Sequence, residues 1–160
     1  MMKKLLVMLL TSIMLISTVA CGEKGVDPSQ IVANTMGEKL MVDFMTRVDA
    51  DKNASNMDIA EGLLTNPVID FAGATMEVEP GYLAGFSNEV HGFSDGVMFS
   101  PMIGSIPFVG YIFTTEDASA AQTFAEQLKA DADPRWNICT EATETVVETR
   151  GNKVFFVMCP

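Results

Sequence analysis

Residues 145–158 read Thr145-Val146-Val147-Glu148-Thr149-Arg150-Gly151-Asn152-Lys153-Val154-Phe155-Phe156-Val157-Met158. The segments 145–150 and 153–158 carry the β-branched and aromatic side chains that favour strands. Between them, Gly151-Asn152 is a two-residue hairpin signal. This part of the chain is therefore predicted to form an antiparallel hairpin.

Further strands are predicted upstream of this hairpin. Thr75–Glu79 alternates polar and apolar side chains, as a half-exposed strand does. Residues 97–103 and 106–114 predict two more strands around a short turn. Prolines near the turn remove N–H donors and indicate sheet edges or bulges there. Residues 81–96 mix glycines with aromatic side chains and predict no clear element.

Three helices are expected, over residues 28–48, 57–65 and 115–133. The first has Asp27 as its cap and Pro28 at its first helical position, and apolar side chains then recur at helical spacing. Prolines follow the second and third helices, and the residue before a proline avoids helical geometry. Helices that segregate from strands indicate an α+β fold, in which helices pack against an antiparallel sheet.

The first twenty residues differ from the rest of the chain. Lys3 and Lys4 precede an apolar run over residues 5–20, which is shorter than the ~20 apolar residues of a spanning helix. A basic start, a short apolar middle and small residues at the exit are typical of a signal peptide for export.

The apolar run leads into Ser17-Thr18-Val19-Ala20-Cys21-Gly22. Here the chain resembles bacterial lipoprotein precursors, in which diacylglycerol is added to a cysteine thiol before cleavage. Ala20 and Cys21 match that motif, whereas Thr18 stands where leucine is usual. The resemblance implies a membrane protein held by lipid on Cys21 and facing outside the cytoplasm. The alternative is ordinary cleavage after Ala20, which would release an unlipidated protein.

The expected organisation follows from this resemblance. Residues 1–20 form a cleaved signal peptide, residues 21–26 a lipid-anchored tether, and residues 27–160 a single α+β domain. The layout of the mature part also resembles small, uncharacterised lipoproteins of one globular domain, a resemblance that implies no activity.

Composition and charge limit the possible functions. The chain is 48% hydrophobic and 19% charged, as folded proteins are. Its formal net charge is −11, and removal of Lys3 and Lys4 with the leader would make it −13. Such a charge opposes binding to nucleic acid or to anionic lipid head groups. No nucleic-acid partner is expected, and membrane attachment must come from the acyl chains because there is no second long apolar run.

Two cysteines remain once Cys21 is assigned to the anchor. Outside the cytoplasm, Cys139 and Cys159 are candidates for a disulfide. It would close a loop of about twenty residues and contribute ~3 kcal/mol. The alternative is a pair of buried thiols.

The polar segment 49–55, between two predicted helices, resembles the opening of an EF-hand calcium loop. In that loop, oxygen ligands stand at the first, third and fifth positions. The second half departs from that family, because Ala54 stands where glycine is expected and Ala60 where a bidentate glutamate is expected. The same residue types are also ordinary turn and cap residues. The candidate ligands are Asp49, Asp51, Asn53, Ser55 and Glu61.

A second motif, Gly92-Phe93-Ser94-Asp95-Gly96, fits the G-x-S-x-G elbow of α/β-hydrolases. Those enzymes need a histidine later in the chain, and the only histidine, His91, comes before Ser94.

No zinc-ligand spacing, phosphate loop or dinucleotide fingerprint is present, so no cofactor is expected. The leading hypothesis is a non-enzymatic binding or interaction domain for an unidentified protein or small molecule. A calcium module and a serine hydrolase are the alternatives.

Overall fold

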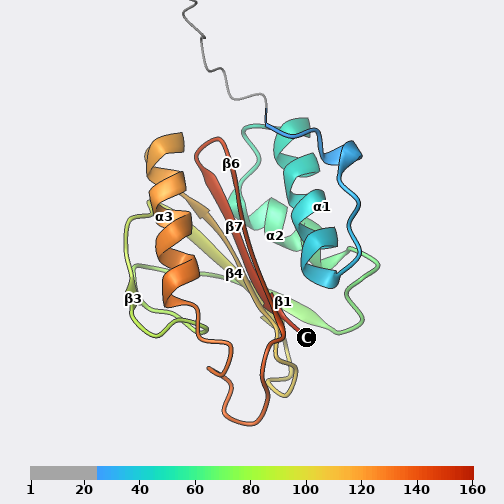
Figure 1. Cartoon of the computed structure of the whole chain (residues 1–160), viewed down its shortest axis with the longest axis vertical. Helices are drawn as coiled ribbons and strands as arrows, with labels where there is room; N and C mark the ends of the chain where they lie inside the picture. Colours follow the sequence, from blue (N-terminus) through green and yellow to red (C-terminus); the bar gives the residue numbers. More distant parts are fainter. Residues whose placement is uncertain (1–24) are drawn as a thin grey trace, which may run out of the picture.

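The computed structural model describes residues 25–160. In this part of the chain, three α-helices pack on a five-stranded antiparallel sheet (Figure 1), which confirms the predicted α+β class. The elements are the 3₁₀ helix η1 (Pro28–Gln30), α1 (Met36–Ala50), α2 (Asn56–Leu64), β1 (Gly73–Glu77), β2 (Gly81–Tyr82), β3 (Glu89–Val90), β4 (Asp95–Pro101), β5 (Val109–Thr114), α3 (Ala118–Asp131), β6 (Glu144–Arg150) and β7 (Lys153–Cys159).

The strands of the main sheet run in the order β1-β4-β5-β7-β6, and each neighbouring pair is antiparallel. The predicted closing hairpin is confirmed as β6–β7, with Arg150 opposite Lys153. Gly151 adopts a φ of +61° in its turn, a value that favours glycine. Strands β2 and β3 form a separate two-stranded ribbon within the segment that the sequence left unassigned.

Helices cover both faces of the sheet, so the molecule has three layers (Figure 1). Phe155 and Val157 of β7 pack in the core with α1 and α2. Phe156 and Met158 pack on the other face with α3. Every residue of β7 is buried. After Lys153 the strand carries only apolar side chains, as is typical of a strand covered on both faces.

The first helix differs from its prediction. Asp27 and Pro28 begin only the short η1, in which the Asp27 carboxylate accepts a hydrogen bond from the Ser29 N–H. Helix α1 begins eight residues later, where Thr35 and Glu38 form a reciprocal capping box. Such a box satisfies two N–H donors, more than the single bond at Asp27 does. The chain between η1 and α1 carries no helix.

Other boundaries shift by a few residues. Helix α3 begins at Ala118 with Asp117 as its cap, so Thr115 and Glu116 precede the helix instead of forming its first turn. Strand β5 begins at Val109, because Pro107 and its neighbours form the connection from β4. Helix α2 lies within one residue of its predicted bounds.

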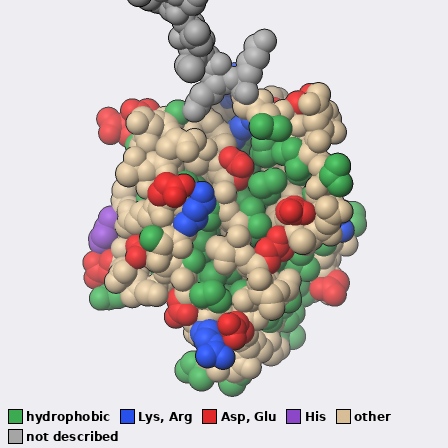
Figure 2. Space-filling view, in the orientation of Figure 1, with side chains coloured by type: hydrophobic (Ala, Val, Ile, Leu, Met, Phe, Trp, Pro, Cys, Tyr) green, Lys and Arg blue, Asp and Glu red, His purple; other side chains and the backbone are tan. Residues whose placement is uncertain are grey.

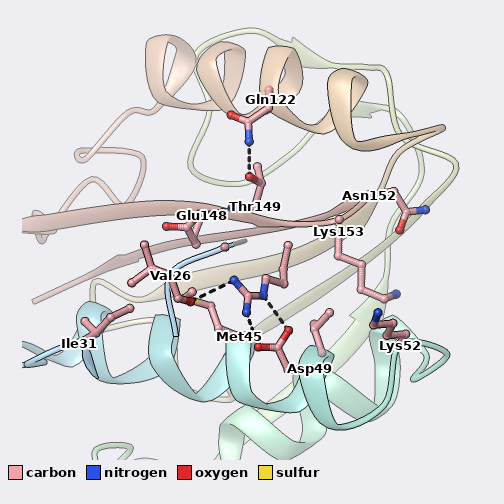
Figure 3. A pocket seen from close by; sticks show the side chains of 14 residues that line it. Val26, Ile31, Met45, Asp49, Lys52, Gln122, Glu148, Thr149, Asn152 and Lys153 are labelled. Carbon is pink, nitrogen blue, oxygen red and sulfur yellow. Dashed lines mark hydrogen bonds and ion pairs between the residues drawn. The ribbon is translucent and has the colours of Figure 1, made fainter. Parts of the chain in front are cut away.

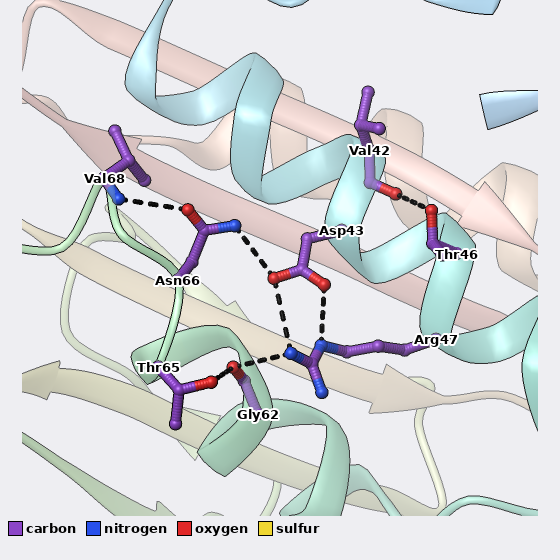
Figure 4. A network of polar contacts seen from close by, with 8 residues as sticks. All are labelled: Val42, Asp43, Thr46, Arg47, Gly62, Thr65, Asn66 and Val68. Atoms are coloured by element: carbon purple, nitrogen blue, oxygen red, sulfur yellow. Dashed lines mark hydrogen bonds and ion pairs between the residues drawn. The ribbon is translucent and has the colours of Figure 1, made fainter. Parts of the chain in front are cut away.

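A polar network fixes helix α1 against helix α2 (Figure 4). Asp43 accepts hydrogen bonds from Arg47 Nε at 2.8 Å and from Asn66 Nδ2 at 2.9 Å. Arg47 Nη2 in turn donates to the Gly62 carbonyl at 2.9 Å. These bonds join α1 to α2 and to the segment that follows α2.

Candidate functional site

A cavity of about 870 Å³ lies where the end of α1, the β6–β7 turn and the N-terminal segment meet (Figure 3). Its volume falls within the range of small-molecule sites, roughly 300–1,000 Å³. The lining residues combine a few apolar side chains with charged and amide groups. They are Gly25, Val26, Ile31, Met45, Val48, Asp49, Lys52, Gln122, Glu148, Thr149, Arg150, Gly151, Asn152 and Lys153.

Arg150 holds one wall of this cavity together. Its Nε donates to Asp49 Oδ1 at 2.7 Å, and its Nη2 contacts Asp49 Oδ2. Its Nη1 also donates to the Val26 carbonyl at 3.2 Å, which fastens the N-terminal segment to the hairpin. The hydrogen bonds from Arg150 hold the pKa of Asp49 below its ordinary range. The Arg150 guanidinium is thus already hydrogen-bonded to Asp49 and to the Val26 carbonyl.

Side chains alternate along β6, and this alternation divides the cavity lining between the two faces of the sheet. Arg150 points toward α1, whereas Thr149 points toward α3 and accepts a hydrogen bond from Gln122 Nε2 at 2.7 Å. The Asn152 side chain donates to the Thr115 carbonyl at 3.1 Å. These contacts hold the hairpin turn in place. The side-chain amides of Gln122 and Asn152 each donate a hydrogen bond within the protein.

A row of polar residues crosses the sheet at this end. Asp95 pairs with Thr114, Thr114 with Lys153, and Lys153 with Arg150. Cross-strand partners share a face, so this row closes the α1–α2 side of the core. Lys153 is only 8% exposed and Asn56, at the start of α2, is 1% exposed.

The Asn56 side chain joins the row at its centre. Its Oδ1 accepts hydrogen bonds from Lys153 Nζ at 2.8 Å and from Thr114 Oγ1 at 3.1 Å. Its Nδ2 donates to the Asp95 carbonyl at 3.2 Å. Lys153 Nζ also lies 3.4 Å from Thr114 Oγ1. The Asn56 amide therefore links helix α2 to strands β4, β5 and β7.

The charge on Lys153 has no carboxylate partner at ion-pair distance among residues 25–160. Burial lowers the pKa of Lys153, and the more distant charge of Asp95 acts in the opposite direction. Three cationic side chains line the cavity, Lys52, Arg150 and Lys153, beside the two acids Asp49 and Glu148.

Three of the candidate calcium ligands, Asp49, Asp51 and Ser55, make other contacts. Asp49 pairs with Arg150, and Asp51 accepts a hydrogen bond from the Asn53 N–H in a local turn. Ser55 is the N-cap of α2 and bonds with Asp58. Glu61 lies exposed on α2. Their arrangement is that of turn and cap residues, and no group of three or more His, Cys, Asp or Glu side chains in residues 25–160 is placed to hold a metal ion.

Ser94 and His91 do not form a pair. The Ser94 hydroxyl donates to the Thr114 carbonyl at 3.2 Å, whereas the His91 ring contacts Glu89 at 2.9 Å. The motif leads into strand β4 and not into a helix, so it lacks the setting of a hydrolase elbow. The serine is held by the neighbouring strand.

Cys139 and Cys159 are free thiols, and the predicted bridge is absent. Cys139 is exposed in the connection between α3 and β6, whereas Cys159 is buried beneath α1. The Cys159 Sγ donates to Glu144 at 3.3 Å. Burial and this carboxylate raise the pKa of the Cys159 thiol. The two thiols thus lie in different surroundings, one exposed and one buried. Cys21 lies outside the described residues.

Sequence reasoning did not find Lys153 or Asn56. One signal was available: Lys153 occupies a position that shares a strand face with Phe155 and Val157, both buried residues. A lysine at such a position must either leave the core or find partners inside it. Its partner Asn56 carries no comparable signal, because the two residues are 97 positions apart.

No protein-family model, curated protein or solved structure matches this chain. Of the helices formed by residues 25–160, none has the length and hydropathy needed to span a bilayer.

Proposed function

We propose that this protein is a lipid-anchored, extracytoplasmic lipoprotein whose domain binds a small ligand in the α1–hairpin cavity without catalysing a reaction. The observation that carries the proposal is the cavity itself, with its volume of about 870 Å³ and its fixed polar wall. The leader sequence and Cys21 support export and anchoring.

The position of the cavity relative to the tether supports this combination. Cys21 precedes Gly25 by four residues, which span at most ~14 Å of extended chain. Gly25 and Val26 line the cavity. Lipid on Cys21 would therefore hold the cavity close to the membrane surface, where it can receive a ligand from the membrane or from its vicinity.

A binding role is favoured over catalysis by the contacts of the candidate nucleophile. General-base activation of a serine needs a base within hydrogen-bond reach, oriented by a third group. The Ser94 hydroxyl instead donates to a backbone carbonyl, and His91 contacts Glu89.

The anchor is tested with Cys21→Ser and with Cys139→Ser as the matched control. We expect the wild-type protein and Cys139→Ser to enter the detergent phase of Triton X-114 as processed lipoproteins. Cys21→Ser should accumulate as the unprocessed precursor. Mass spectrometry of the mature N-terminus decides the point, since an unmodified Cys21 or cleavage at another position would contradict the proposal.

Ligand binding is tested by screening small molecules for a rise in melting temperature, followed by chemical-shift mapping of each compound that stabilises the protein. A ligand that binds only the folded state raises the free energy of unfolding by RT ln(1 + L/Kd), where L is the free ligand concentration. We expect the shifted amides to cluster at residues 148–153 and at the end of α1. Ligands that map only to other surfaces, or a screen in which no compound binds, would refute a binding role for this cavity.

A further inference from the structure

We infer that the ligand of this cavity carries a phosphate group that pairs with Lys153 and Lys52. The inference rests on the proposed function, that the cavity binds a ligand, and adds the chemical class of that ligand. It is carried by a buried lysine that faces the cavity and has no carboxylate partner among the described residues.

A buried charge is costly unless it is paired. Lys153 is part of the row of polar residues that crosses the sheet. Its two hydrogen-bond partners, Asn56 and Thr114, are both neutral. An ammonium group has three N–H donors, and these two contacts use at most two of them. At least one N–H donor thus remains for an anion, as does a charge that no carboxylate of residues 25–160 pairs at ion-pair distance.

Lys52 supplies a second cation at the same cavity. It lies exposed in the turn that follows α1, and Figure 3 shows its side chain and that of Lys153 near the hairpin-turn end of the site. Arg150 adds charge but is already bonded to Asp49 and Val26. The two lysines are therefore the lining cations that remain to pair with a ligand, and lysine binds phosphate as a point charge.

The grouping of cations here contrasts with the rest of the protein. The chain has ten Lys and Arg against 21 Asp and Glu. Of the charged side chains in residues 25–160, three cations line the cavity beside two acids. On the face drawn in Figure 2, acidic side chains are spread widely and basic ones appear only as isolated groups. An anion would thus meet repulsion over most of the surface and attraction at this site.

Two sources can supply a phosphate group at this position. One is a soluble phosphorylated molecule, and the other is the head group of an anionic phospholipid next to the anchor. Both present negatively charged phosphate oxygens to Lys153, so the chemistry is shared and the source is decided by experiment.

The test uses the processed protein in neutral detergent, titrated calorimetrically with three probes. These are inorganic phosphate, dihexanoylphosphatidylglycerol and the uncharged dihexanoylglycerol. We expect one or both phosphate-bearing probes to bind and the uncharged probe not to bind. Binding of inorganic phosphate alone indicates a soluble ligand, whereas tighter binding of the phospholipid indicates a head group.

Lys153→Met is the decisive variant, with Lys129→Met on α3 as a control that makes the same charge change at an exposed position. Loss of a charged hydrogen bond should weaken phosphate binding about tenfold in Lys153→Met, while Lys129→Met binds as the wild type does. Lys52→Met, at an exposed position, should also weaken binding, and it keeps the test valid if Lys153→Met does not fold.

The possible failures are distinguishable. Uncharged ligands that map to the cavity and bind Lys153→Met as tightly as the wild type would overturn the phosphate inference and leave the proposed function intact. Equal phosphate binding by the wild type, Lys153→Met and Lys52→Met would overturn the inference as well. A cavity that accepts no ligand of any charge would overturn both.

Discussion

The ammonium nitrogen of Lys153 lies 2.8 Å from Oδ1 of Asn56, which precedes it by 97 residues in the chain. The amide is almost fully buried and also contacts Thr114 and Asp95. A charged group and its neutral partner thus join the first residue of α2 to three strands at the edge of the core.

The two members of this pair should respond differently to mutation. Asn56→Leu leaves the Lys153 charge buried without its acceptor, and we expect the free energy of unfolding to fall by about 2–4 kcal/mol. Lys153→Met removes the charge together with its need for a partner, so the fall should be below about 1.5 kcal/mol. Urea denaturation followed by circular dichroism gives both values. A larger loss in Lys153→Met would show that the ammonium itself stabilises the fold.

The Asp49–Arg150 pair should make stability depend on pH at the acidic end. Arg150 holds the pKa of Asp49 below its ordinary value of 3.8 in the folded state. The folded state therefore binds this proton less readily than the unfolded chain does, and the resulting stabilisation is lost as pH falls through the folded pKa. We expect Asp49→Asn to destabilise the protein at pH ~7 and to do so much less at pH ~2.5. Asp70→Asn, at an exposed position without side-chain hydrogen bonds in the described structure, is the control. An equal effect of Asp49→Asn at both pH values would contradict the linkage.

Gly37→Ala should destabilise the protein although alanine is the better helix former by about 1 kcal/mol. Gly37 lies in the first turn of α1, where an added Cβ would meet Val146 Cγ2 at 2.7 Å and Glu144 Cδ at 2.8 Å. Relief of that clash must displace the Val146 and Glu144 side chains, and the Glu144 carboxylate accepts hydrogen bonds from Thr35 and from the Gly37 N–H. We therefore expect a net loss of about 1–3 kcal/mol. Gly104→Ala is the matched control because nothing lies within 4 Å of its added Cβ. Chemical denaturation that shows Gly37→Ala as stable as the wild type would mean that α1 approaches β6 less closely.

The two free cysteines should differ in reactivity. Thiolate is the reactive form of cysteine, and burial raises the pKa of the Cys159 thiol, whereas Cys139 is exposed. We expect a maleimide to label one thiol of residues 25–160 rapidly in the native protein and the second only after unfolding. Peptide mapping by mass spectrometry identifies the labelled residue. Failure of both thiols to react until a reductant is added would reveal the disulfide that the sequence suggested.

Much of the secondary structure follows from short-range patterns. The β6–β7 hairpin needs only Gly151 and two flanking β-prone segments, and α2 needs only a polar cap and a following proline. The start of α1 was mispredicted because only the cap signal at Asp27 was used, and that signal begins the short η1. The capping box of Thr35 and Glu38, which begins α1, was overlooked in the sequence.

Residues a few positions apart set helix, turn and strand preferences, so the α+β class and the hairpin could be inferred from residue order alone. The arrangement of the cavity residues could not be inferred in this way, because it depends on contacts between distant parts of the chain. Strand register aligns Lys153 with Thr114, and the packing of α2 brings Asn56 over both. Whether a lysine at a strand end reaches solvent or lies buried beside a neutral amide depends on which layers cover it. That coverage is set by chain segments nearly a hundred residues away, whose placement reflects the burial of two apolar faces and not any local preference.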